Sequence, residues 1–259
     1  MTAQSAISLQ SVAKTYGDGR VLDGVSLQVK AREFLAIVGP SGSGKTTLLR
    51  LINRLSEPTS GVVQVEGEDV QTTDAVNLRR RIGYVFQGVG LFPHMTVAEN
   101  IAITPRLLGW DAARIAARID ELIDLVRLDR GKHRERFPAQ LSGGERQRVG
   151  VARALGAEPR IVLMDEPFGA LDPLTRDALG DDYRRLHDEL GLTTVMITHD
   201  MLEAVLLADR IAVIHGGRIV ADGTPQALLH DGRDDYVREL MATPRRQAER
   251  LRNLMERPR

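Results

Sequence analysis

The stretch Phe34-Leu-Ala-Ile-Val-Gly-Pro-Ser-Gly-Ser-Gly-Lys-Thr-Thr47 decides the fold of this chain. The five apolar residues Phe34–Val38 predict a buried strand, and the glycine-rich segment after them predicts a tight turn. Leucines and an isoleucine recur along 46–54 at helical spacing, so a helix is expected to begin directly after the turn. A strand, a phosphate-binding turn and a helix in this order predict an α/β core that binds ATP or GTP.

The turn matches the pattern G-x-x-x-x-G-K-[ST], in which glycines let successive backbone N–H groups face phosphate oxygens. We expect Lys45 to contact the β- and γ-phosphates and Thr46 to bind Mg²⁺. A turn that only connected strand to helix would not require these two side chains. The pattern is shared by kinases, GTPases, helicases and transport ATPases. The residues expected to bind the nucleotide here are Gly39, Pro40, Ser41, Gly42, Ser43, Gly44, Lys45, Thr46 and Thr47.

A second apolar run, Ile161–Met164, ends in two acids, Asp165 and Glu166. The end of a buried strand in an α/β sheet opens onto the polar site. Asp165 is expected to hold Mg²⁺, directly or through water, and Glu166 to orient the water that attacks the γ-phosphate. Taken alone, two solvated acids at a strand end are equally consistent with the pattern. The phosphate-binding turn favours the catalytic interpretation.

The remaining pattern predicts a core that is split in the sequence by a helical insert. Apolar residues with helical spacing fill 97–153, notably Ile115, Ile119 and Leu122. The tail, 236–259, has spaced apolar residues among many arginines and predicts amphipathic helices interrupted near Pro244, which could be no more than a solvated tail. Strands are expected at 7–12, 25–29, 61–65, 82–86, 161–164, 194–197 and 211–214, and helices at 175–189 and 202–208.

Leu141-Ser-Gly-Gly-Glu-Arg-Gln-Arg148 resembles the signature sequence of the ATP-binding-cassette family. Read without the resemblance, Ser142 followed by Glu145 predicts a capping box at the start of a helix, and both interpretations can hold together. The resemblance implies that Ser142, Gly143 and Gly144 bind the γ-phosphate of ATP held by a second subunit. Two MgATP would then lie between head-to-tail cassettes, in a homodimer or a dimer with a second cassette.

Four further positions resemble the family in the expected order. Tyr16 resembles the aromatic residue that stacks on adenine, with a tyrosine that merely ends a strand as the alternative. Gln87 resembles the glutamine between the core and the insert, which implies a catalytic role and a role at the metal. The alternative is an ordinary amide side chain in a loop. Asp172 resembles an acid of the dimer interface that binds the nucleotide. His199 resembles the switch histidine near the γ-phosphate and attacking water.

The resemblance covers about residues 7–230 and implies a RecA-like P-loop core with an N-terminal antiparallel β-subdomain and an inserted α-helical subdomain. The nucleotide-binding domain is expected at 1–235, with its core at about 1–87 and 156–235 and its helical subdomain at about 88–155; a helical tail follows at 236–259. The helical subdomain would contact an integral membrane permease. Leu91, Phe92 and Pro93 are possible contacts, or pack within the subdomain.

Composition limits the partners and the location. The chain has 35 basic and 35 acidic residues, so no overall positive field draws it to nucleic acid, and no nucleic-acid partner is expected. It has no cysteine, which fits a reducing cytoplasm. Its apolar runs are far shorter than the roughly 20 residues that span a bilayer. We therefore expect a cytoplasmic ATPase, peripheral on the inner face of the membrane.

The transported substrate rests on a narrower resemblance. Residues 81–101 and Leu107–Trp110 are similar to importers of quaternary-ammonium osmoprotectants such as glycine betaine, choline or carnitine, which also use an extracytoplasmic solute-binding protein. Members of that group often carry paired regulatory domains after the cassette, and the residues up to Arg259 leave no room for them, so ionic-strength sensing through such domains is not expected. Import of amino acids, methionine or sulfonates stays open. A cassette of DNA repair or translation, and a small-molecule kinase, are further alternatives.

Overall fold

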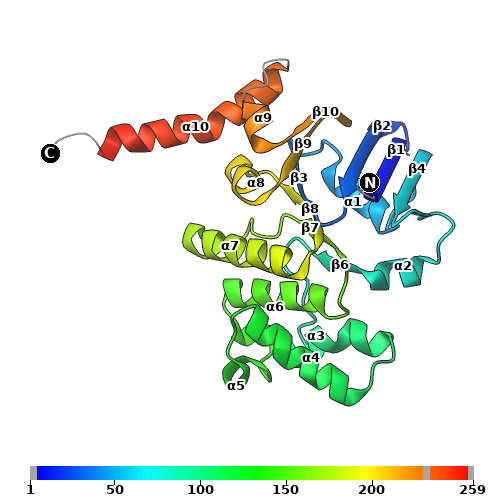
Figure 1. Ribbon diagram of the computed structural model, residues 1–259, viewed down its shortest axis with the longest axis vertical. Coiled ribbons are helices and arrows are strands. Elements are labelled where there is room, and N and C mark those ends of the chain that lie inside the picture. Colours follow the sequence, from blue (N-terminus) through cyan, green and yellow to red (C-terminus); the bar gives the residue numbers. More distant parts are fainter. Residues whose placement is uncertain (1–4, 230–233, 256–259) are drawn as a thin grey trace.

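The computed structural model describes residues 5–229 and 234–255, which form two sheets and ten α-helices within those ranges (Figure 1). One sheet is antiparallel, has the order β2-β1-β4-β5 and contains the N-terminal strands. Its strands are β1 (Ser5–Tyr16), β2 (Gly19–Lys30), β4 (Ser60–Val65) and β5 (Glu68–Asp69). This sheet is the expected N-terminal antiparallel β-subdomain.

The second sheet has six strands in the order β10-β9-β3-β8-β7-β6, and all neighbours but β10 and β9 run parallel. Val38 pairs with Thr198 and Asp165 pairs with Ile197, so β3, β7 and β8 end at one edge of the sheet. The strands are β3 (Phe34–Val38), β6 (Ile82–Val85), β7 (Ile161–Asp165), β8 (Thr193–Thr198), β9 (Arg210–His215) and β10 (Arg218–Gly223).

The core consists of two layers, one on each face of this sheet. Along β3 the side chains alternate between them: Phe34, Ala36 and Val38 join the cluster that includes the helical insert, whereas Leu35 and Ile37 pack with α1 (Lys45–Ile52) and the antiparallel sheet. This alternation follows from the two-residue period of a strand. Because both faces of the sheet are covered, β3 and β7 are buried along their whole length, and their sequences are apolar up to Asp165. Helix α1 packs on one of these faces and begins directly after the phosphate-binding turn.

The helical insert lies at the lower end of the molecule in Figure 1. Its helix α6 packs against both α3 and α7 and so connects the insert to the core. The insert contains α3 (Val97–Leu107), α4 (Ala112–Leu125), α5 (Arg130–His133), a 3₁₀ turn (Pro138–Gln140) and α6 (Gly143–Leu155). The core helices that follow are α7 (Pro173–Leu190), α8 (Met201–Leu207) and α9 (Pro225–Leu229).

The structure differs from the sequence-based expectation in several elements. Helix α2 (Ala75–Arg81) and the strands β5 and β10 were not expected. The predicted interruption near Pro244 is wrong: α10 (Asp235–Met255) is one helix that extends away from the body (Figure 1). A proline inside a helix removes one hydrogen bond, but the arginine, glutamine, alanine and glutamate that follow favour helix and continue it. Within the described ranges, no helix is both long and apolar enough to cross a bilayer.

Candidate nucleotide-binding site

The phosphate-binding turn, 39–44, requires glycine for both conformation and space. Gly44, the N-cap of α1, has φ 99°, and a Cβ there would lie 2.6 Å from Cδ2 of Leu22. A Cβ on Gly39 would lie 2.1 Å from the carbonyl oxygen of Ile214. Any larger residue at either position would push the turn away from β2 or β9. Packing of the backbone therefore fixes the shape of the turn.

Polar groups in the turn and at the start of α1 lie where they can bind an anion. The Nζ of Lys45 donates hydrogen bonds to the carbonyl oxygens of Gly39 and Pro40, both at 2.8 Å. Burial lowers the pKa of Lys45, and the charges of Glu166 and Asp165 oppose that shift. The buried Oγ of Ser43 has no hydrogen-bond partner among the described residues, a costly state that a phosphate oxygen would relieve.

Thr46 and Asp165 meet where a metal bound to phosphate is expected. The Oγ1 of Thr46 donates to Oδ1 of Asp165 at 3.2 Å, and burial raises the pKa of this carboxyl group. No group of three or more histidine, cysteine and acidic side chains within the described residues could hold a metal ion. A hydroxyl and one carboxylate still fit Mg²⁺, which binds through one or two protein oxygens together with phosphate oxygens and water.

Two of the residues expected to act with Glu166, Gln87 and His199, lie next to its carboxylate. Its Oε2 accepts a hydrogen bond from Nε2 of Gln87 at 3.1 Å and lies 3.4 Å from Nδ1 of His199. Its backbone N–H bonds to the carbonyl oxygen of Ile197 at 3.0 Å, and its φ is 45°. Such a conformation is uncommon for a residue with a side chain. The turn after β7 thus aims the carboxylate toward the ends of β6 and β8.

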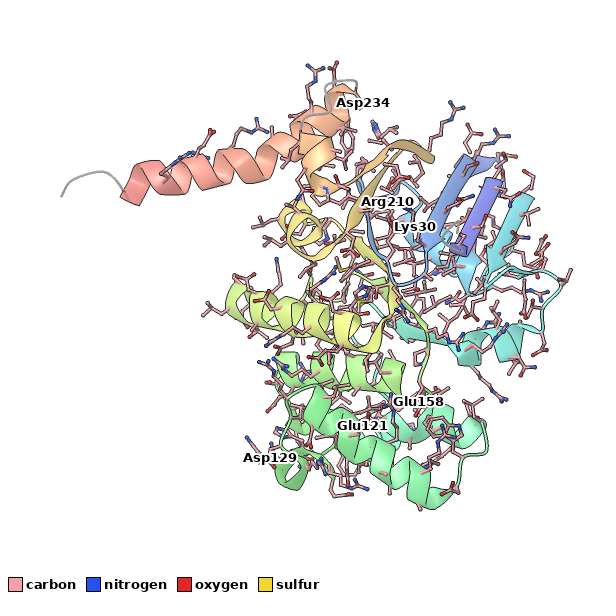
Figure 2. The ribbon with its side chains drawn as sticks, viewed as in Figure 1. Lys30, Glu121, Asp129, Glu158, Arg210 and Asp234 are labelled. Atoms are coloured by element: carbon pink, nitrogen blue, oxygen red, sulfur yellow. The ribbon has the colours of Figure 1, made fainter. Side chains whose placement is uncertain are left out.

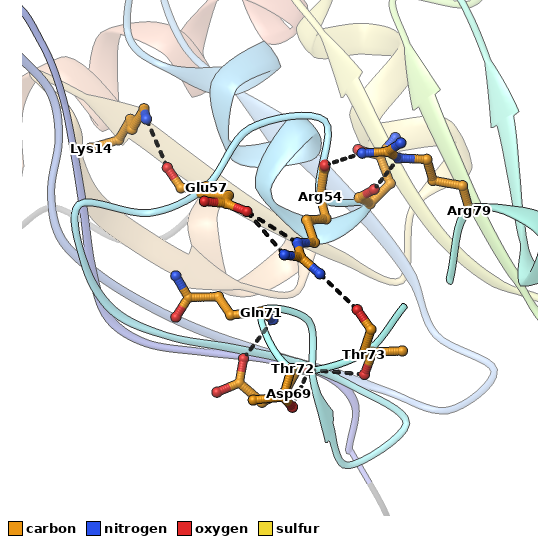
Figure 3. Close-up of polar contacts among 9 residues, drawn as sticks. Lys14, Arg54, Glu57, Asp69, Gln71, Thr72, Thr73 and Arg79 are labelled. Carbon is orange, nitrogen blue, oxygen red and sulfur yellow. Dashed lines mark hydrogen bonds and ion pairs between the residues drawn. The ribbon is translucent and has the colours of Figure 1, made fainter. Parts of the chain in front are cut away.

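Tyr16 lies at the end of β1 with half of its surface exposed (50%). Its hydroxyl group contacts Oγ of Ser56 at 2.9 Å, and the Nζ of Lys14 lies 4.7 Å from the centre of its ring. Lys14 in turn donates to the carbonyl oxygen of Glu57, whose carboxylate pairs with Arg54 (Figure 3). A purine could stack on Tyr16 at the ring face opposite Lys14, or displace the lysine.

The signature residues lie on a different surface from the phosphate turn. Ser142 is the N-cap of α6: its Oγ accepts from the N–H of Glu145 at 3.2 Å, and the Glu145 carboxylate accepts from the N–H of Ser142 at 2.7 Å. The predicted capping box is confirmed. A groove of about 480 Å³ runs from Ser142, Gly143 and Gly144 to Asp172, the N-cap of α7, and no residue of the phosphate turn lines it.

Two contributors to these sites were not singled out from the sequence. Tyr84 on β6 hydrogen-bonds Asp165, and burial together with that charge raises the pKa of its phenol. His133 on α5 contacts Glu145 of the capping box at 2.9 Å. Tyr84 could have been found because it shares with Asp165 the end of adjacent parallel strands. Nothing in the local pattern around His133 points to Glu145.

A parallel sheet with a phosphate-binding turn after β3, acids at the end of β7 and a capped helix in a separate insert defines a P-loop nucleotide-binding cassette. A family model described as ABC transporter matches residues 22–169. The chain belongs to this family.

Similar proteins include the choline transport ATP-binding protein OpuBA of Bacillus subtilis, 47% identical over 241 residues, covering 92% of this chain and 63% of OpuBA. The sulfate/thiosulfate import ATP-binding protein CysA of Bradyrhizobium diazoefficiens is 47% identical over 235 residues, covering 89% of this chain and 67% of CysA. The dimeric structure of the ATP-binding cassette MJ0796 bound to ADP and Pi superposes with a TM-score of 0.76 at 34% identity, covering 84% of this chain and 98% of that one. The chain thus spans less than two thirds of OpuBA, whose length includes residues without a counterpart here.

Proposed function

We propose that this chain is the ATP-hydrolysing motor subunit of an importer. The observation that carries this proposal is the grouping of Gln87 and His199 around the Glu166 carboxylate. The neighbouring acid, Asp165, contacts Thr46 at the start of α1. Hydrolysis of a phosphoanhydride needs a phosphate cradle, charge neutralisation and an oriented water, and this edge of the sheet offers residues for each.

In the proposed mechanism the turn and the first residues of α1, together Gly39 to Thr47, bind the phosphates. Lys45 exchanges its two carbonyl contacts for phosphate oxygens, and its positive charge stabilises the charge that develops there. Thr46 and Asp165 would hold Mg²⁺, which neutralises phosphate charge when bound. Glu166 accepts a hydrogen bond from the attacking water and orients it, while Gln87 and His199 hold the Glu166 carboxylate.

We further propose that two chains act head to tail, so that each ATP is bound between the phosphate-binding turn of one chain and Ser142 of the other. This arrangement is supported by the separate surfaces that carry the two half-sites: the groove from Ser142 to Asp172 has a capped helix N-terminus but no phosphate turn. The relative MJ0796 is described as dimeric. Closure around ATP and reopening after hydrolysis would then move the helical inserts.

The permease is proposed to dock in an apolar groove of about 500 Å³ at the junction of the insert and the core. Phe86, Gln87 and Phe92 line it, and both aromatic side chains are exposed at 44%. Leu91 instead packs against the core, and Pro93 is exposed outside the groove lining. Because Gln87 lines the groove and also contacts Glu166, a docked helix could bias hydrolysis. The chain would thus be peripheral at the cytoplasmic face.

For the cargo we propose a quaternary-ammonium osmoprotectant, received from an extracytoplasmic binding protein. The similarity of residues 81–101 and Leu107–Trp110 to that group and the similarity to OpuBA support this choice. Sulfate-type anions are the second candidate, because the chain is equally identical to CysA, at 47%. Amino acids and sulfonates are not favoured by a specific observation.

Uptake in the native host tests the proposal. We expect Glu166→Gln at the chromosomal locus to abolish uptake of labelled glycine betaine and choline and to leave sulfate uptake unchanged. A variant that loses sulfate uptake alone would assign the cargo to the second candidate. Unchanged uptake of all three would refute both cargoes.

A further inference from the structure

His133, at the end of α5, connects the surface of the insert to the signature residues. Its side chain is buried, with 4% of the residue exposed. Its Nδ1 lies 2.9 Å from the carbonyl oxygen of Asp129, and its Nε2 lies 2.9 Å from Oε1 of Glu145. Figure 2 labels Asp129 beside α5, at the outer end of the insert. The ring therefore bridges α5 and the first turn of α6.

Both partners of the ring can only accept hydrogen bonds. A carbonyl oxygen carries no proton, and the backbone N–H of Ser142 together with His133 holds the pKa of Glu145 at about 2, so this carboxylate is ionised. A neutral imidazole has one N–H and could satisfy one of the two acceptors. Because the ionised Glu145 carboxylate can only accept, Nε2 is the nitrogen that donates in the contact with it.

Glu145 connects His133 to Ser142, the serine of the signature sequence. One carboxylate oxygen accepts from His133, and the other accepts from the backbone N–H of Ser142 at 2.7 Å. The Oγ of Ser142 accepts from the N–H of Glu145 at 3.2 Å. With the histidine in place, Glu145 cannot turn away without losing a charge-assisted hydrogen bond. The three residues form one unbroken chain of contacts.

We propose that His133 is a positioning residue of the signature site, whose Nε2 fixes Glu145 and thereby holds Ser142 in place for the γ-phosphate on the partner cassette. The inference rests on the proposed function, because it assumes that Ser142 receives ATP from a second copy. Loss of the contact between Nε2 and Glu145 loosens the N-terminus of α6. ATP hydrolysis in the closed dimer should therefore decline when this contact is removed.

The other charged groups around the ring have partners of their own. The Asp129 carboxylate accepts from the N–H of Lys132, and Arg134 pairs with Asp120 of α4. On α3, the carboxylate of Glu99 closes the capping box of its own helix. Among the residues that the structure describes, Glu145 is thus the acid in contact with the ring.

Two substitutions separate positioning from simple packing. His133→Gln places an amide N–H near the Nε2 position, where it can donate to Glu145 without titrating. His133→Asn carries its amide near the Nδ1 position and cannot reach Glu145. We expect His133→Asn to lower kcat about tenfold with unchanged ATP affinity of the isolated chain, and His133→Gln to recover most of kcat.

The experiment combines kcat and ATP Kd with thermal unfolding of each variant and ¹⁵N NMR of the His133 ring. The NMR spectrum should show a proton on Nε2; a ring whose Nε2 carries no proton would overturn the inference even in a preparation that hydrolyses nothing. Wild-type kcat in His133→Asn, or equal losses in both variants that track their unfolding temperatures, would also overturn it while leaving the proposed ATPase intact. Absent hydrolysis in wild type would instead contradict the proposed function.

Discussion

The Nε2 of Gln87 lies 3.1 Å from Oε2 of Glu166, joining the segment after β6 to the turn after β7. The same oxygen lies 3.4 Å from Nδ1 of His199, which follows β8. The two parallel strands on either side of β7 thus deliver one side chain each to a single carboxylate oxygen of Glu166. A carboxylate held from both sides is oriented before any substrate arrives, which lowers the cost of orienting an attacking water.

Glu166→Gln should reduce ATP turnover at least about a hundredfold and leave ATP binding intact, because the amide keeps the shape but loses the negative acceptor. Steady-state phosphate release and equilibrium nucleotide titration measure the two quantities. Glu158→Gln is the matched control: Glu158 also has a positive φ, of 55°, but it pairs with Arg114 on the surface. Turnover near wild type in Glu166→Gln would remove this residue from the catalytic role.

Lys45→Ala should weaken ATP affinity about 10- to 100-fold, since it removes a cation aimed into the phosphate turn. Its two contacts to the turn carbonyls are lost as well, so the turn is expected to loosen. Calorimetric titration with ATP and with adenosine checks the assignment. Affinity for adenosine should change little, and an equal loss for both ligands would point to collapse of the turn. Lys30→Ala, on the exposed end of β2, serves as control.

Ser142 caps helix α6 and is also proposed to contact phosphate. Two substitutions distinguish the contribution of the cap from that of the phosphate contact. Ser142→Ala should cost about 1 kcal/mol of stability through the lost cap, whereas aspartate is a good N-cap and should retain it. Both should abolish most ATP hydrolysis, the aspartate because its charge opposes the γ-phosphate. Thermal unfolding and phosphate release are the readouts. Full activity in Ser142→Asp would show that only the cap matters.

Glu203 on α8 gives a pH dependence of stability. Burial raises its pKa from 4.5 to about 7, so between these pH values the folded chain keeps a proton that the unfolded chain loses. The free energy of unfolding should therefore fall as pH rises through this window. Glu203→Gln should remove this contribution and be more stable than wild type by on the order of 1–3 kcal/mol at pH 8, with the difference vanishing near pH 4. Denaturant unfolding at both pH values measures it; a pH-independent difference would contradict the assignment.

Local sequence signals predicted much of the fold. The apolar run before Gly39 and the helix after it are present because glycine conformation, strand burial and helix capping are local properties. The continuity of α10 through Pro244 was missed because one residue with poor helix propensity was weighed above the many favourable ones after it. Strand β10 has a mixed pattern of burial and is recognisable only by its pairing with β9.

The site was predictable in its residue types but not in its contacts. Asp165 and Glu166 follow a buried strand, which local pattern reveals. The contact between Gln87 and Glu166 depends on the order of the strands, since β6 and β7 are neighbours although the whole helical insert separates them in sequence. The bridge from His133 to Glu145 similarly depends on how α5 packs, for which no period or motif gives a signal.

The most direct test of the central claim is the mass of Glu166→Gln in solution, measured by analytical ultracentrifugation with and without MgATP. The account predicts a monomer without nucleotide and a dimer with MgATP, because hydrolysis cannot reopen the closed pair, and it predicts that adding Ser142→Asp to the same chain prevents the dimer. A chain that stays monomeric with saturating MgATP, or that dimerises equally well with Ser142→Asp, would contradict two ATP molecules bound between head-to-tail cassettes.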